Sequence, residues 1–93
     1  MPYIIPELRK RLDTSIHEMV NCLTEHRKSG QAGQLNYVIA RIVFRLLRRQ
    51  GWKYSLMNEF IGALECCKLE IYRRLVADYE DIKMEENGDV FGV

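Results

Sequence analysis

The run of apolar residues between Gln34 and Gln50 constrains this chain more than any other feature. Its apolar side chains recur at spacings of three and four, which is the period of one face of an α-helix. They are Leu35, Val38, Ile39, Ile42, Val43, Leu46 and Leu47. Tyr37, Ala40 and Phe44 extend the apolar surface almost around the axis. Such a helix is buried on most sides, and only the arc that carries its arginines must reach water. Gly51 is well placed to end it.

Two further helical patterns make the predicted fold class mainly α, with three main helices in a small bundle. Ser15 followed by Glu18 is a capping-box pattern, so the first main helix is expected to begin there and to end near Lys28. A short separate helix from Pro6 to Leu12 is expected before it. Residues 29–33 are expected to form a loop because of their glycine and serine content.

The third main helix is expected to follow Ser55. Its apolar stripe consists of Leu56, Phe60, Leu64, Cys67, Ile71 and Leu75. Gly62 inside this stripe costs roughly 1 kcal/mol relative to alanine, which suggests that a neighbouring helix approaches closely. The pattern leaves open whether the helix breaks after Ala77, where Asp78 can cap a new helix, and it ends by Gly88 in either case.

At 93 residues the chain fits a single domain, 1–93, with an extended arm at 1–5 and an extended tail at 89–93. The strand-like pieces 3–5 and 90–91 are expected to pair with each other or with copies in another subunit. Domains of this size have a thin stability margin, which oligomerisation often relieves. Because one chain lacks enough partner surface to cover the helix at 34–50, a homo-oligomer is predicted, as a dimer or a symmetric ring.

Composition argues against several classes of function. The net charge of +1 gives no case for sequence-specific nucleic-acid binding. Thirteen Lys or Arg against seven Asp or Glu before Asp78 give +6, and the remaining residues give −5. This distribution favours contact between a basic body and an acidic tail, within one chain or between subunits. The alternative is that the acidic tail is a solvated helix end. No secretory signal or apolar run of about 20 residues is evident, so the cytoplasm and no membrane are expected. The cysteines, Cys22, Cys66 and Cys67, are interpreted as buried thiols.

Candidate ligand-binding residues are basic and aromatic. Arg41 and Arg45 share one helical face with Arg48, and guanidinium groups bind phosphate or carboxylate well. A second group combines cations with an aromatic ring that can stack on a base: Lys68, Tyr72, Arg73 and Arg74. The alternative for both groups is a solvated rim around an apolar core.

No catalytic motif, cofactor site or metal site is predicted. His17 and His26 lie on different turns, and no glycine-rich phosphate loop exists. In a metal-dependent nucleotide hydrolase, Glu65, Asp78 and Asp81 would be the metal ligands. Their spacing lacks the paired pattern of carboxylates that such enzymes use. Asn36, Asn58 and Glu65 lie beside apolar stripes, so they are interpreted as structural polar residues that form interhelical hydrogen bonds, or as pocket-lining residues.

Several short motifs occur together from Leu35 onward. They are Leu35-Asn36-Tyr37-Val38-Ile39, Asn58 with Ile61-Gly62 and Leu64-Glu65, Tyr72-Arg73-Arg74, and Tyr79-Glu80-Asp81 before Glu86-Asn87-Gly88-Asp89-Val90. With these motifs the chain resembles a family of small phage and bacterial proteins of unassigned function. The resemblance implies a phage or prophage setting and no activity. Members of that family often have proline where this chain has Asp78. Such a proline would favour a helix break after Ala77, and the departure at Asp78 leaves that break open.

Three functions follow as hypotheses. The first is a non-enzymatic interaction protein, phage-encoded and homo-oligomeric, that binds a host or phage protein. The second is a binder that sequesters an anionic nucleotide signal between subunits through the basic and aromatic residues named above. The third is the metal-dependent hydrolase.

Overall fold

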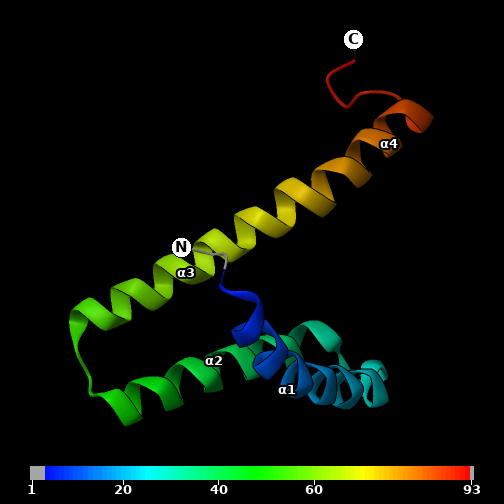
Figure 1. The fold of residues 1–93 in the computed structure, drawn as a ribbon. Coiled ribbons are helices and arrows are strands. Elements are labelled where there is room, and N and C mark those ends of the chain that lie inside the picture. The colour runs from blue at the N-terminus through cyan, green and yellow to red at the C-terminus, as the bar shows by residue number, and fades with distance from the viewer. Residues whose placement is uncertain (1–3, 93) are drawn as a thin grey trace. The chain divides into compact units, whose positions relative to one another are not determined.

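The computed structural model describes residues 4–92, which are almost entirely helical (Figure 1). The elements are α1 (Pro6–Glu25), the 3-10 turn η1 (Arg27–Ser29), α2 (Gln31–Gln50), α3 (Tyr54–Ile71), the π-helical η2 (Tyr72–Val76) and α4 (Ala77–Asn87). No strand occurs within residues 4–92, so the mainly α prediction is confirmed and the predicted strand pairing is not seen there. Residues 1–3 of the predicted arm and residue 93 of the predicted tail lie outside the described residues.

The chain divides into two compact units, Met1–Met57 and Asn58–Val93. Unit 1 contains α1 and α2, and the boundary between the units falls near the start of α3. Unit 2 contains the rest of α3 with η2 and α4. The single-domain prediction stays a prediction.

In unit 1, α1 is one continuous helix, so the predicted separate helix at 6–12 and the predicted start at Ser15 were wrong. Pro6 occupies the first turn, where its missing N–H costs nothing. Leu8, Leu12 and Ile16 continue the apolar stripe at spacings of four through the expected cap. The continuous helical pattern thus outweighs one capping pattern, and the helix runs through Ser15.

The connection between α1 and α2 is shorter than expected, because α2 begins at Gln31 rather than Gln34. Gly30 adopts a φ of 92°, which reverses the chain without the penalty that a side chain would bring. The side-chain amides of Gln31 and Gln34 donate to the carbonyl oxygens of Leu23 (3.3 Å) and His26 (2.7 Å). They satisfy acceptors that the end of α1 leaves free.

Helix α2 packs beside α1 and ends at Gln50, as predicted. The N–H of Gly51 donates to the Leu47 carbonyl at 2.8 Å, and the φ of 103° at Gly51 stops the helix. The rings of Phe44 and Trp52 meet edge to face at 5.3 Å between centroids.

Unit 2 is a single uninterrupted helical stretch from α3 through η2 to α4 (Figure 1). The sequence left open whether the helix breaks after Ala77, and it does not break there, since Val76 and Ala77 keep helical backbone angles. A π-turn over Tyr72–Val76 lies there instead, and such turns add a residue without ending a helix. The helix ends at Asn87, before Gly88 at φ 89°, as predicted.

The described part of the tail is a turn rather than extended, which corrects the prediction for 89–93. The N–H of Gly92 donates to the Asp89 carbonyl (3.1 Å), and the N–H of Phe91 donates to Asp89 Oδ1 (2.9 Å). An aspartate that accepts a hydrogen bond from the backbone two residues on is a frequent turn former.

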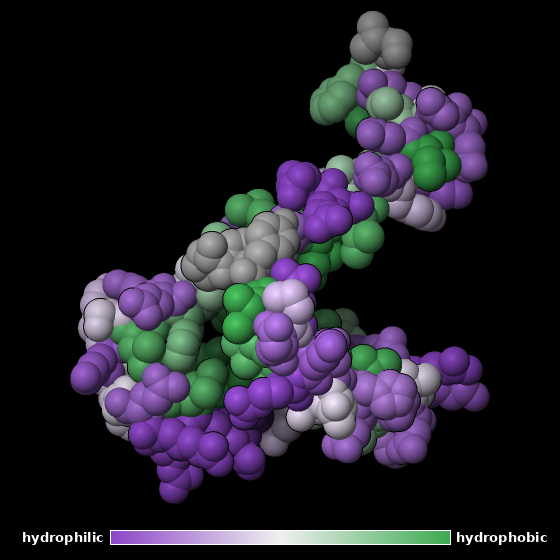
Figure 2. Space-filling model, in the orientation of Figure 1, coloured by the Kyte–Doolittle hydropathy of each residue, from purple (hydrophilic) through white to green (hydrophobic). Residues whose placement is uncertain are grey.

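Very little of this fold is buried. Leu47, at 7% exposure, is the only buried hydrophobic residue among residues 4–92. Apolar side chains on all four α-helices remain exposed, and hydrophobic surface is visible among hydrophilic residues in Figure 2. The predicted burial of α2 on most sides is therefore absent within one chain.

Two smaller predictions fail for the same reason. Cys22, Cys66 and Cys67 are exposed rather than buried, because no neighbouring element within their own unit covers their faces. A Cβ at Gly62 would meet nothing within 4 Å, so the close helix approach predicted there is not seen. No helix among the described residues has the length and apolarity needed to cross a bilayer.

Candidate functional site

The arginines of α2 form the most concentrated positive surface of unit 1. Arg41, Arg45 and Arg48 lie at i, i+4 and i+7, so they share one helical face, with Arg49 beside them. We call these four residues the arginine stripe. Helix α2 contains no acidic residue. None of the ion pairs found in residues 4–92 involves the stripe.

The arginine stripe is bordered by apolar side chains. A shallow hollow at the α1–α2 junction is lined by Met19, Tyr37, Val38 and Ile42 together with Arg41 and Arg45. Tyr37 and Ile42 are 65% and 52% exposed. The Arg41 guanidinium lies 5.6 Å from the centroid of the Phe44 ring, which holds the cation beside an aromatic face. The surface can therefore take a ligand that is both apolar and anionic.

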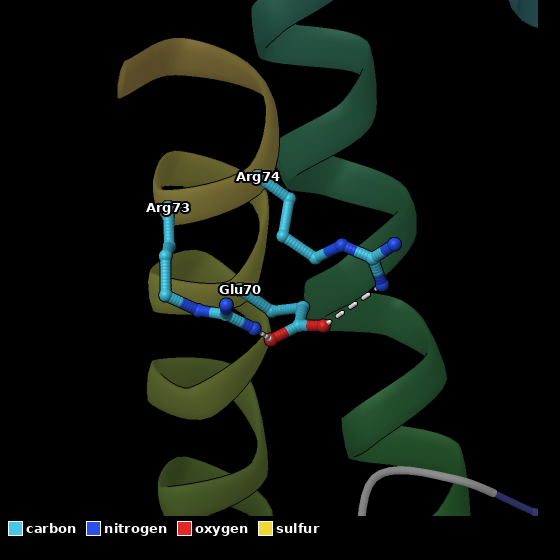
Figure 3. A network of polar contacts seen from close by, with 3 residues as sticks. All are labelled: Glu70, Arg73 and Arg74. Atoms are coloured by element: carbon cyan, nitrogen blue, oxygen red, sulfur yellow. Dashed lines mark hydrogen bonds and ion pairs between the residues drawn. The ribbon is translucent and has the colours of Figure 1, made fainter. Parts of the chain in front are cut away.

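The second predicted cluster lies in unit 2, and its cations already have partners. Lys68 Nζ lies 3.0 Å from Glu65 Oε1. The guanidinium groups of Arg73 and Arg74 approach the two oxygens of Glu70 at 2.7 and 3.3 Å (Figure 3). These pairs are one helical turn apart, the spacing at which opposite charges meet on a helix surface. Their positive charge is consequently much reduced.

Tyr72 is held in a similar way across the π-turn. Its hydroxyl donates a short hydrogen bond to the Glu80 carboxylate. That hydrogen bond, the negative charge of Glu80 and a little desolvation raise the pKa of Tyr72 above its ordinary value of 10.0. The Tyr72 ring stays half exposed, but its hydroxyl is committed to Glu80.

The six predicted ligand residues thus fall in different units. Arg41 and Arg45 lie on α2 in unit 1, whereas Lys68 and Tyr72 to Arg74 lie along one stretch of unit 2. The four in unit 2 are brought together with Glu65, Glu70 and Glu80, none of which the sequence reasoning assigned to them as partners. The signal was present, since Glu65 and Lys68 are three residues apart and Glu70 lies three and four residues before the arginines.

The predicted structural polar residues are all exposed in the chain. Asn36 and Asn58 make no side-chain hydrogen bond within residues 4–92, and Glu65 pairs with Lys68 on its own helix. Their interhelical hydrogen bonds therefore stay a prediction. No group of three His, Cys, Asp or Glu side chains in the described part of the chain is arranged to hold a metal ion.

Sequence reasoning missed the apolar side chains of the acidic end of unit 2. Tyr79 and Ile82, three residues apart on α4, are 60% and 54% exposed, and Phe91 is 85% exposed. Tyr79, Met84, Val90 and Phe91 line a hollow beside the C-terminal turn. The i, i+3 spacing of Tyr79 and Ile82 could have revealed this apolar edge.

The two units also differ in charge. Unit 1 has ten Lys or Arg against four Asp or Glu, a net charge of +6. Unit 2 has four against nine, a net charge of −5. Each unit therefore presents its own candidate surface, basic in unit 1 and acidic in unit 2, and each surface is mixed with exposed apolar side chains.

Comparison with known proteins places the chain in a family without assigning it a function. No curated protein and no solved structure matches the sequence. A family described as Domain of unknown function (DUF6899) matches residues 1–90. Because this match covers nearly the whole sequence, the chain belongs to that family.

Proposed function

We propose that the protein is a non-enzymatic helical binding protein that acts through protein–protein contacts and forms a homo-oligomer. One observation carries the proposal: only Leu47 is buried among the hydrophobic residues 4–92, while large apolar side chains lie exposed along every α-helix. Contiguous exposed apolar surface in a soluble chain is typical of interaction sites.

Energetics favour association. Ordering the backbone costs roughly 1–2 kcal/mol for each residue, and burial of apolar surface is the main term that offsets this cost. Each apolar Å² removed from water contributes only about 25 cal/mol, so residues 4–92, among which one hydrophobic side chain is buried, gain little from burial. A partner that covers the exposed faces of α2 and α4 supplies the missing burial.

The nucleotide-sequestering alternative receives less support. Three of its six proposed contact residues, Lys68, Arg73 and Arg74, already neutralise carboxylates in unit 2. A nucleotide phosphate would have to displace Glu65 and Glu70 from them. Arg41 and Arg45 alone, on an open helix face, do not enclose a ligand as small-molecule sites do.

The biological setting belongs to the same proposal. The resemblance of its motifs to those of small phage and bacterial proteins supports a phage or prophage origin. A host or phage protein is then the partner in addition to further copies of the chain, and the host cytoplasm is the compartment in which they meet.

Sedimentation velocity at micromolar concentration tests the proposal. We expect the wild-type chain to sediment as a dimer or a larger symmetric assembly. Ile42→Glu places a charge on the exposed apolar edge of α2 and should dissociate the assembly, whereas Gln50→Glu, an equally charged change at the end of α2, should not. A wild-type monomer that retains full helicity by circular dichroism would contradict the proposal.

Thermal melts against cyclic and linear nucleotides, with and without Mg²⁺, test the alternatives in parallel. We expect no shift of the melting temperature with any nucleotide. A large shift without Mg²⁺ would favour the nucleotide binder, and a shift that requires Mg²⁺ and yields product would favour the hydrolase.

A further inference from the structure

Two helices of the chain present charged stripes of opposite sign and equal length. We infer that the arginine stripe of α2 in one copy packs against the acidic face of α4 in a second copy, and reciprocally, so that two equivalent contacts close a dimer. The inference rests on the proposed function, because it names the partner that covers the exposed helices: a second copy of this chain.

The acidic face of α4 consists of Asp78, Asp81 and Glu85. These residues lie at i, i+3 and i+7 and therefore share one side of the helix. The other carboxylates of α4 include Glu80, which accepts the Tyr72 hydroxyl, and Glu86, which pairs with Lys83 at 3.1 Å. Asp78, Asp81 and Glu85 take part in none of the ion pairs or hydrogen bonds found in residues 4–92.

The two stripes match in length. Arg41 to Arg48 spans seven residues, and so does Asp78 to Glu85. At a rise of 1.5 Å per residue each stripe is about 10.5 Å long. Three cations can therefore face three carboxylates along two adjacent helices without a change of helix length or curvature.

Apolar side chains flank both stripes. On α2, Tyr37 and Ile42 lie to either side of the arginines and are 65% and 52% exposed. On α4, Ile82 and Tyr79 border the carboxylates and are 54% and 60% exposed. Contact between the helices removes these side chains from water while the charges stay at a solvated edge, the usual division between the core and the rim of an interface.

Charge decides which faces meet. Pairing α2 with α2 would bring two sets of four arginines together, and like charges at an interface cost several kcal/mol. Pairing α2 with α4 joins a unit of net charge +6 to one of −5. Two such contacts, related by a two-fold axis, pair the arginine stripe and the acidic face of each copy. No charged stripe is then left to bind a third copy, so the assembly closes as a dimer.

Charge-reversed variants test the dimer. One variant carries Arg41→Glu and Arg45→Glu, and the other carries Asp78→Lys and Asp81→Lys. Each variant alone sets like charges against each other, and we expect its dimer dissociation constant to rise about 100-fold or more by sedimentation. Mixed in equal amounts, the two variants should recover wild-type affinity, because both contacts of the mixed dimer then join opposite charges.

Each other outcome has a distinct meaning. Recovery only when all four changes are in one chain, with no recovery on mixing, would show that the stripes meet within a chain and overturn the inference. Dimers unaffected by either reversal would overturn it too, while the proposed function would stand. A monomeric wild type would overturn both. Circular dichroism of each variant checks that the helices still form, and Lys53→Glu serves as a charge-reversal control outside α2 and α4.

Discussion

The basic side chains of the two units have opposite surroundings. In unit 2, ion pairs link Lys68 to Glu65 and Arg73 and Arg74 to Glu70 within a single helical turn. In unit 1, the arginines of α2 have no acidic residue on their helix, and no ion pair among residues 4–92 includes them. The basic side chains named in unit 2 are thus neutralised on their own helix, whereas those of α2 favour an acidic partner outside their helix.

The units also differ in packing. In unit 1, α1 and α2 contact each other across a tight turn, and Leu47 of α2 is buried. Unit 2 is a single helical stretch whose stability rests on interactions between residues less than ten positions apart. Isolated helices are marginal in water, so unit 2 depends more strongly on contacts outside itself.

The largest expected effect concerns packing in unit 1. Leu47→Ala truncates the one hydrophobic side chain that is buried among residues 4–92 and leaves a cavity. We therefore expect a loss of about 2–3 kcal/mol of stability by urea denaturation at fixed protein concentration. Leu75→Ala is the matched control in unit 2, where the side chain is 66% exposed. Its effect should stay within about 0.5 kcal/mol. Equal losses for both variants would mean that Leu75 is covered in the assembled protein.

Substitution of one glycine in each unit should have the next largest effect on stability. Gly62→Ala adds a methyl group that meets nothing within 4 Å and removes a flexible residue from a helix interior, so we expect unit 2 to gain about 1 kcal/mol. Gly51→Ala should destabilise unit 1 by about 1 kcal/mol, because its φ of 103° disfavours a side chain. Thermal melts of the two variants measure both signs. A loss with Gly62→Ala would reveal a helix from another copy packed against this position.

These differences also explain how far the sequence could be read. The helix ends at Gln50 and Asn87 were predictable because Gly51 and Gly88 supply the positive φ that stops a helix locally. The continuity of α1 was not, because a local capping pattern at Ser15 competes with an apolar stripe that only the whole helix reveals. The π-turn at Tyr72–Val76 leaves no mark in the apolar spacing, which continues through it.

In the candidate site, too, the features that follow from local geometry were predictable and those that depend on side-chain conformation or packing were not. The shared face of Arg41, Arg45 and Arg48 follows from helix geometry alone and was predictable. The neutralisation of Lys68, Arg73 and Arg74 was not predicted, although the glutamates stand at the right spacing, because only side-chain conformation shows which pairs form. The i, i+3 spacing of Tyr79 and Ile82 indicates a shared apolar edge, but their exposure depends on which elements cover α4, and no local pattern predicts that.

Ion pairs in unit 2 should contribute less than either packing or glycine changes. Glu70→Gln removes the charge that Arg73 and Arg74 share (Figure 3). The arginine side chains are 60–70% exposed, so solvent screens both pairs, and we expect a loss of about 0.5 kcal/mol in low salt. The loss should shrink as salt is added, in contrast to Leu47→Ala. A salt-independent effect would show that Glu70 acts by packing instead of by charge.

The smallest expected effect is the pH response of Tyr72, which tests whether the π-turn is held by one hydrogen bond. Glu80 raises the pKa of Tyr72 above 10.0 because the neutral phenol is the donor. A pKa raised in the folded state stabilises the fold fully below pH 10.0, and this stabilisation is lost as the pH rises through the folded-state pKa.

In an ultraviolet titration of the five tyrosines, one should ionise at a higher pH than the others, and Glu80→Gln should bring its pKa back towards 10.0. Tyr72→Phe should remove that late ionisation step. It should also remove the same share of the stability loss at alkaline pH that Glu80→Gln removes. If the late step survives Tyr72→Phe, another tyrosine carries it, and unit 2 holds its π-turn by backbone geometry alone.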